Sequence, residues 1–293
     1  MESMYFKEQL RREGRKEFWK QTGDKLRKGI AERRLLNSEP PDSLREYFHI
    51  EKKQLNGHAF YEMSPLGSKY ELNIFYAHGG AYVNKITAFH WEFLGQIGKQ
   101  ISCKFTIPLY PLAPEYTYKD TFDFVYPLYK QLIEKQEDII LMGDSAGGGL
   151  VLALSHLLNE KSDLQPKKII LISPWLDLTL THPEIDSIEK DDPFLSKLGA
   201  IEAGKMYAGG ENPTHYLLSP LYGDLNDLPD IMLIMGTHDI LAPDARRFVE
   251  KAKNIDVKVE YFEFPEMVHI FPIFDFPEAN EAKKLIIQTI KKP

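Results

Sequence analysis

The sequence lacks the features that mark secreted, membrane-spanning and repeat proteins. Cys103 is the single cysteine among 293 residues, so no intrachain disulfide can form, which fits a reducing cytoplasm. No apolar run approaches the roughly 18 residues of a membrane span, and the first residues contain no apolar signal segment. No fixed-period repeat or low-complexity tract is visible. We therefore expect a cytoplasmic, untargeted protein with no stable membrane insertion.

Basic residues are fewer than acidic residues. Lys and Arg number 36 against 43 Asp and Glu, a formal net charge of −7, which argues against a nucleic-acid partner. The distribution is uneven, because residues 1–36 hold 11 basic and 6 acidic side chains. We interpret this basic segment as the solvated face of helices rather than as a membrane-contacting surface.

Short apolar runs recur along the chain and alternate with helical patterns. Runs that are apolar on both strand faces predict strands covered by helices on two sides, hence an α/β fold with a mainly parallel, twisted sheet. A hairpin comes first, with Asn56-Gly57 at its turn. Strands are then predicted near 70–77, 104–109, 138–142, 168–173, 231–235 and 257–263, and helices near 87–101, 120–136, 146–160, 242–254 and 277–291.

The remaining segments predict helical additions to one main domain. Residues 1–44 contain short amphipathic patterns that end at Pro40-Pro41, and the main domain follows over 45–293. Prolines and glycines between 183 and 216 interrupt the alternation around a helical piece near 195–207. We interpret that stretch as an insertion on the carboxyl side of the strands.

The candidate nucleophile is Ser145. It follows a short apolar strand and precedes a helical pattern, and Gly143 and Gly147 flank it in the G-x-S-x-G arrangement of a nucleophile elbow. A hydroxyl needs such exposure, with a base beside it, to attack a carbonyl carbon. The alternative is a serine that caps the N-terminus of the helix.

Backbone donors for an oxyanion are expected from two places. His78-Gly79-Gly80-Ala81 directly follows a predicted strand, so the N–H groups of Gly79 and Gly80 can converge, and Ala146 after the serine adds a third. The alternative is a glycine turn that only leads out of the strand.

The base and its orienting carboxylate are expected after two later strands. Asp239 follows the strand at 231–235, and His269 follows the last strand, so Ser145, Asp239 and His269 occur in the order found in α/β-hydrolases. Asp244 and His238 are nearby competitors, although Asp244 suits a helix cap. No metal site is expected.

Five motifs in order over about residues 70–275 resemble the hormone-sensitive-lipase-like carboxylesterases. They are His-Gly-Gly-Ala at 78–81, Tyr-Pro-Leu-Ala-Pro-Glu at 110–115, Gly-Asp-Ser-Ala-Gly at 143–147, Ser-Pro-Trp-Leu-Asp at 173–177 and Asp-Pro-Phe at 192–194.

The resemblance implies an α/β-hydrolase fold with a helical cap, part of it from residues 1–44, and a cofactor-free, two-step ester hydrolysis. It implies that Ser145, Asp239 and His269 form the triad and that Asp144 and Glu115 shape the site. Ala81 and Ile270 depart from the glycines usual in the family's H-G-G-G and H-G-F motifs. Ala81 retains its N–H and can still donate unless its position needs a positive φ angle. Ile270 affects the expected backbone of the histidine loop more than the role of His269.

These observations predict a serine carboxylesterase for small, short-acyl esters. An amidase or small-peptide hydrolase on the same site stays open, as does a non-catalytic ligand-binding protein of the same fold. Aromatic candidates for the substrate pocket are Trp91, Phe194 and Tyr216, each with core packing as the alternative. A homodimer also stays open, because no interface is identified by the sequence.

Overall fold

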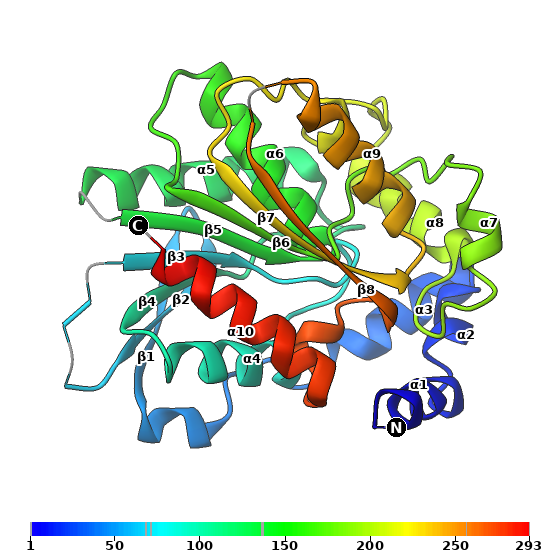
Figure 1. Cartoon of the computed structure of the whole chain (residues 1–293), viewed down its shortest axis with the longest axis horizontal. Helices are drawn as coiled ribbons and strands as arrows, with labels where there is room; N and C mark the ends of the chain where they lie inside the picture. Colours follow the sequence, from blue (N-terminus) through cyan, green and yellow to red (C-terminus); the bar gives the residue numbers. More distant parts are fainter. Residues whose placement is uncertain (1, 68, 71, 136–137, 256, 293) are drawn as a thin grey trace.

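One twisted sheet organises the chain in this computed structural model, which describes residues 2–67, 69–70, 72–135, 138–255 and 257–292 (Figure 1). Positions 1, 68, 71, 136, 137, 256 and 293, which some predicted ranges include, lie outside the described residues. The strand order is β1-β2-β4-β3-β5-β6-β7-β8. The strands are β1 (Phe48–Leu55), β2 (His58–Pro65), β3 (Leu72–Ala77), β4 (Cys103–Pro108), β5 (Asp138–Asp144), β6 (Lys168–Ile172), β7 (Asp230–His238) and β8 (Val259–Val268).

The sheet is mainly parallel, as the apolar runs predict. Strand β2 is antiparallel to both of its neighbours, β1 and β4, and all pairs from β4 to β8 are parallel. The predicted hairpin is confirmed, with Leu55 opposite His58 across the Asn56-Gly57 turn. Because parallel strands end at one edge, the loops after β3, β5, β7 and β8 gather at that edge of the sheet.

Alternate strand residues enter two cores, one on each face of the sheet. In β6, Ile169 and Leu171 join one buried cluster and Ile170 and Ile172 join the other. Helices α5 (Tyr118–Glu134), α6 (Ala146–Glu160) and α9 (Ala242–Lys253) cover the first face, and α4 (Ala88–Gly98) and α10 (Pro277–Lys291) cover the second (Figure 1). The predicted α/β-hydrolase architecture is thereby confirmed. Strands β7 and β8 run a few residues beyond their predicted ends, to His238 and Val268.

Helices from two distant parts of the chain lie together beside the carboxyl edge of the sheet (Figure 1). The first group is α1 (Glu2–Arg12), α2 (Arg15–Trp19) and α3 (Gly23–Arg34), and the second is α7 (Ile185–Ile188) and α8 (Lys197–Ala208). They touch closely, because a Cβ on Gly199 would lie only 2.3 Å from the carbonyl oxygen of Trp19. Phe18, Trp19, Leu26 and Ile30 join the same buried cluster as α5, α6 and α9. The short helices η1 (Asp42–Glu46), η2 (Pro220–Tyr222) and η3 (Phe271–Ile273) complete the helical elements.

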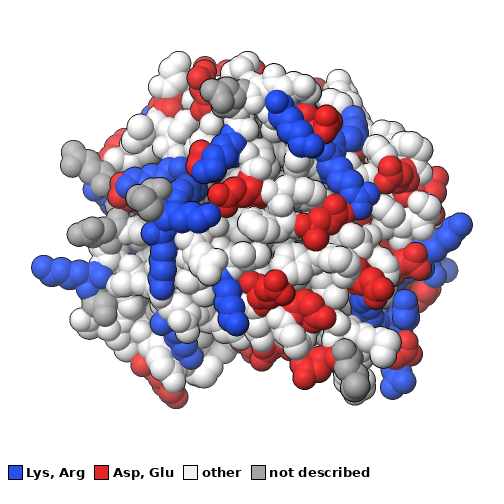
Figure 2. All heavy atoms as spheres, viewed as in Figure 1, with Lys and Arg blue, Asp and Glu red and all other residues white. Residues whose placement is uncertain are grey.

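Charges of both signs are interspersed over the face of the molecule seen in Figure 2. None of the described helices combines the length and the hydropathy that crossing a bilayer requires.

Candidate active site

Ser145 lies in the turn between β5 and α6, where its neighbours leave little room. Its backbone has φ 53° and ψ −122°, a conformation that L-residues rarely adopt. The Ser145 N–H donates to the carbonyl oxygen of Ile172 at 2.9 Å, which fixes the turn against β6. A Cβ on Gly143 would lie 2.4 Å from the carbonyl oxygen of Gly147. The two glycines therefore permit the sharp strand-to-helix turn that the sequence pattern predicts.

The side chains of Ser145, His269 and Asp239 form one hydrogen-bonded chain. Nε2 of His269 lies 2.9 Å from Oγ of Ser145, and Nδ1 of His269 lies 2.8 Å from Oδ2 of Asp239. The Ser145 hydroxyl makes no capping hydrogen bond to α6, which argues against the capping alternative. Asp244, the competing carboxylate, instead pairs with Arg247 at 2.8 Å. The structure thus brings together the three residues that the sequence singles out.

Two opposing effects act on the pKa of His269. Burial alone would lower it, because the charged imidazolium is poorly solvated there. The charge of Asp239 and its hydrogen bond outweigh burial, Asp192 adds to them, and the pKa lies above the ordinary value of 6.5. His269 is therefore a stronger base than an exposed histidine.

Asp192 connects the loop of Phe194 to the loop of Asp239. Its Oδ1 accepts the N–H groups of Phe194 at 2.7 Å and Leu195 at 2.9 Å, and its Oδ2 accepts the N–H of Ile240 at 3.1 Å. Burial and the charge of Asp239 raise the pKa of Asp192 to about 7. Asp192 is a positioning residue, because its contacts reach the triad only through the loop backbone.

The set of backbone donors near Ser145 differs from the prediction at Gly79. The Gly79 N–H donates to Oδ1 of Asp144 at 2.9 Å, because that buried carboxylate needs donors and also takes the Tyr76 hydroxyl at 2.5 Å. Gly79 is therefore not a free donor, which corrects its predicted role. In the described part of the chain, the N–H groups of Gly80, Ala81 and Ala146 donate to no acceptor.

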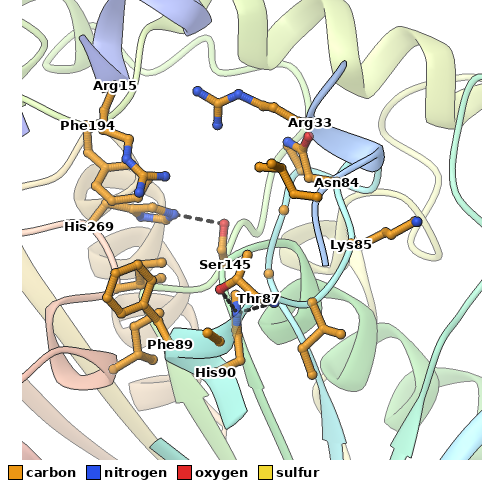
Figure 3. A pocket seen from close by; sticks show the side chains of 18 of the residues that line it. Arg15, Arg33, Asn84, Lys85, Thr87, Phe89, His90, Ser145, Phe194 and His269 are labelled. Atoms are coloured by element: carbon orange, nitrogen blue, oxygen red, sulfur yellow. Dashed lines mark hydrogen bonds between the residues drawn. The ribbon is translucent and has the colours of Figure 1, made fainter. Parts of the chain in front are cut away.

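A cavity of about 300 Å³ opens above Ser145 (Figure 3). Phe194 lines it, with its ring centre 5.4 Å from that of His269, as predicted for a pocket aromatic. Two other predicted pocket residues are corrected. Trp91 is buried on α4 against Tyr61, with its Nε1 donating to a backbone carbonyl, and the Tyr216 hydroxyl donates to the Glu160 carboxylate of α6, so neither side chain lines the cavity. Among the described residues, no group of three or more His, Cys, Asp and Glu is arranged to hold a metal ion.

Comparison with known proteins identifies the family of the chain. A sequence family described as alpha/beta hydrolase fold matches residues 74–273. The chain belongs to the α/β-hydrolase fold family. It is 38% identical over 216 residues to an esterase of Acinetobacter venetianus, which covers 71% of each chain. It is 27% identical over 214 residues to an acetyl-hydrolase of Streptomyces hygroscopicus, which covers 71% of this chain and 72% of that one.

A solved structure confirms the resemblance to the hormone-sensitive-lipase group. The crystal structure of an esterase from the bacterial hormone-sensitive lipase family superposes with a TM-score of 0.79 at 28% identity, covering 89% of this α/β-hydrolase and 94% of that chain. The five motifs in the sequence therefore identify the family correctly.

This α/β-hydrolase has positive φ angles at both departures from the family motifs. Ala81 has φ 54° and Ile270 has φ 48°, a region that favours glycine. The Ile270 N–H donates to Oγ of Ser173 at 3.0 Å, which helps to hold the residue after His269. Ala81 and Ile270 thus carry local backbone strain close to Ser145 and His269.

Two other motif residues, Glu115 and His78, make structural contacts. Glu115 pairs with Arg34 of α3 at 2.5 Å, which ties the N-terminal helices to the main domain. His78 stacks on Tyr110 at 4.5 Å between ring centres, and burial lowers the pKa of His78 to about 4. His78 is therefore neutral and structural at neutral pH.

The two arginines of the cavity are not anticipated by the sequence interpretation. Arg15 and Arg33 line the cavity, although the basic N-terminal segment has the pattern of a solvated helical face. Their spacing along α2 and α3 does not reveal that a pocket lies beneath them. The only signal is the excess of positive charge itself.

Proposed function

We propose that this chain hydrolyses carboxylic esters of small acids through an acyl-enzyme on Ser145. The observation that carries the proposal is the hydrogen-bonded chain from Ser145 through His269 to Asp239 at the floor of the cavity. Membership of the α/β-hydrolase family and relatives named esterase and acetyl-hydrolase support ester hydrolysis as the reaction.

The first half of the reaction forms the acyl-enzyme. His269 accepts the Ser145 proton at Nε2 while Oγ attacks the ester carbonyl carbon, and Asp239 stabilises the imidazolium. The N–H groups of Gly80, Ala81 and Ala146 donate to the oxyanion. When the intermediate collapses, the bond to the alcohol oxygen breaks and His269 returns the proton to that oxygen.

The second half releases the acid. Water loses a proton to His269 and attacks the acyl carbon, the same donors hold the second oxyanion, and Ser145 regains its proton as the acid leaves. Each removed donor costs about 10² to 10³ in rate in comparable sites. This chemistry uses side chains and backbone of this chain alone.

The size of the cavity and the lining residues from the N-terminal segment support a preference for short acyl groups. Its volume is about 300 Å³, and the N-terminal segment contributes Trp19 of α2, Arg33 of α3 and Leu36, which follows α3, to its lining. We propose that residues 1–44 and 183–216 together form the cap, for which the contact between Trp19 and Gly199 is the main support. A cytoplasmic location, for which the single Cys103 is the support, belongs to the same proposal.

The test combines a substrate panel with a nucleophile variant. Rates are measured on 4-nitrophenyl acetate, butyrate, octanoate and palmitate and on the 4-nitroanilides of the two shortest acids. We expect turnover of the short esters to exceed that of the long esters and of both anilides. Ser145→Ala should lose about 10⁴-fold or more of the esterase rate while its melting temperature stays near that of the wild type.

Three results would contradict the proposal. Anilide turnover equal to ester turnover would favour an amidase, and full activity of Ser145→Ala would remove the assigned nucleophile. Absence of any turnover by a folded wild type would favour the ligand-binding alternative.

A further inference from the structure

The cavity above Ser145 carries unbalanced positive charge. Arg15, Arg33 and Lys85 line it, and its lining contains no Asp or Glu within the residues that the structure describes. The chain as a whole has the opposite balance, a net charge of −7. Like charges around one enclosed space repel one another, so the arrangement favours an anion that enters between them.

Arg33 is held in place without a counter-ion. Its guanidinium carbon lies 3.7 Å from the centre of the Phe18 ring, and in the described ranges it has neither a hydrogen bond nor an ion pair. Burial, together with repulsion from Arg15, lowers the pKa of Arg33 to about 10, so the guanidinium is still charged at neutral pH. The N–H donors of Arg33 are therefore available to a bound ligand.

Arg15 faces the same space from α2. Its guanidinium carbon lies 5.8 Å from the centre of the Phe194 ring, and its Nε lies 3.5 Å from a Glu13 carboxylate that is 42% exposed, a weak pair. Figure 3 shows the guanidinium groups of Arg15 and Arg33 pointing toward each other across the space above Ser145. Lys85 turns away and donates to a backbone carbonyl of α3.

Part of the cavity lining is apolar. Phe89, Ile273 and Phe274 contribute to it, and together with Arg15 they also line an adjoining groove toward α1 that includes Glu13, Glu92 and Asp275. The lining of the cavity therefore combines apolar side chains with two guanidinium groups. A substrate that matches both has an apolar part and an anionic part joined through an ester.

We propose that Arg15 and Arg33 select esters that carry a carboxylate remote from the scissile bond. Two forked guanidinium groups fit the two oxygens of a carboxylate, which takes no part in the reaction and only orients the ester. The inference rests on the proposed ester hydrolysis at Ser145 and names its substrate class.

The experiment compares matched esters that differ in charge. The first pair is 4-nitrophenyl hydrogen adipate and its methyl ester, which place the carboxylate on the acyl side. The second pair is 4-acetoxybenzoate and methyl 4-acetoxybenzoate, which place it on the alcohol side. We expect kcat/KM of the anionic ester to exceed that of its neutral partner by about tenfold or more in one of the two pairs.

Variants then assign the preference to the two arginines. Arg33→Met keeps a long side chain against Phe18 and removes the charge, and Arg15→Met does the same beside Phe194. Each should reduce the ratio of anionic to neutral kcat/KM by about tenfold, because the anionic ester loses more than the neutral ester does. Arg33→Lys should keep part of the ratio. Arg27→Met, an exposed position on the same helix α3, removes one charge without touching the cavity and should leave the ratio unchanged.

The outcomes separate the inference from the proposed function. If the wild type hydrolyses the neutral esters and shows no preference for either anionic ester, the inference is wrong and ester hydrolysis stands. The inference is also wrong if Arg27→Met changes the ratio as much as Arg33→Met does. If none of the four esters shows turnover that Ser145→Ala abolishes, the proposed function fails instead.

Discussion

Gly147 lies so close to Ala77 that a Cβ atom on the glycine would be 2.0 Å from the alanine carbonyl oxygen. The contact joins the first turn of α6 to the end of β3, directly behind Ser145. Backbone atoms cannot yield as a flexible side chain can, so the elbow can form here only with glycine.

Gly147→Ala should therefore displace the elbow. We expect the free energy of unfolding to fall by about 3 kcal/mol or more, with loss of most of the activity. Denaturant unfolding and the esterase rate measure the two effects. Gly204→Ala in α8 is the matched control, because its nearest neighbour would lie at 3.4 Å and alanine favours the helix, so its stability should be retained. Similar losses in both variants would refute the steric argument.

Asp239→Asn should reduce kcat by about 10⁴ without unfolding the protein. The physical reason is that an amide next to Nδ1 stabilises neither the imidazolium nor the productive tautomer of His269. Steady-state kinetics and thermal unfolding measure the effect. A variant that retained more than a tenth of wild-type kcat would show that Asp239 does not orient the base.

The pH profile should show an acid limb whose midpoint lies above 6.5. Activity requires neutral His269, and Asp239 holds the pKa of that imidazole above its ordinary value, so kcat/KM should fall as pH drops through the raised pKa. In Asp239→Asn the carboxylate charge is gone, so burial dominates and the midpoint should move to lower pH. A flat wild-type profile between about pH 5 and 8 would contradict a histidine base.

Ala81→Gly should be tolerated better than an ordinary buried alanine-to-glycine change. The left-handed conformation costs Ala81 about 1–2 kcal/mol, which glycine relieves, against a flexibility cost of about 0.5–1 kcal/mol. Ala153→Gly inside α6 carries the flexibility cost of glycine but relieves no left-handed strain. We expect the two free energies of unfolding to differ by about 1 kcal/mol or more in favour of Ala81→Gly. Equal losses would mean that Ala81 carries no strain.

Local patterns explain why much of the fold and the triad could be predicted. The apolar runs of β3 to β7 are long enough to identify buried strands, and Asn56-Gly57 identifies the hairpin turn. Ser145, Asp239 and His269 each follow a strand, and parallel strands bring such loops to one edge. Their meeting is therefore a consequence of topology that the sequence order already contains.

Contacts between distant segments explain what could not be predicted. The sequence shows two adjacent glycines but not that Asp144 takes the Gly79 N–H. It shows Trp91 as a large aromatic on a helix, but not which side of α4 faces the core. Arg15 and Arg33 face a cavity only because α2 and α3 fold back over the sheet edge, and no local pattern records that fold-back.

The cavity combines lining residues from the N-terminal segment with Ser145 and His269 from the main domain. Trp19, Arg33 and Leu36 come from the first 36 residues, whereas Ser145 and His269 directly follow strands β5 and β8 of the sheet. Substitutions in the N-terminal helices can therefore change which substrates enter the cavity while the residues at the site of bond cleavage stay the same. Changes confined to residues 1–36 are then enough to alter the substrate range.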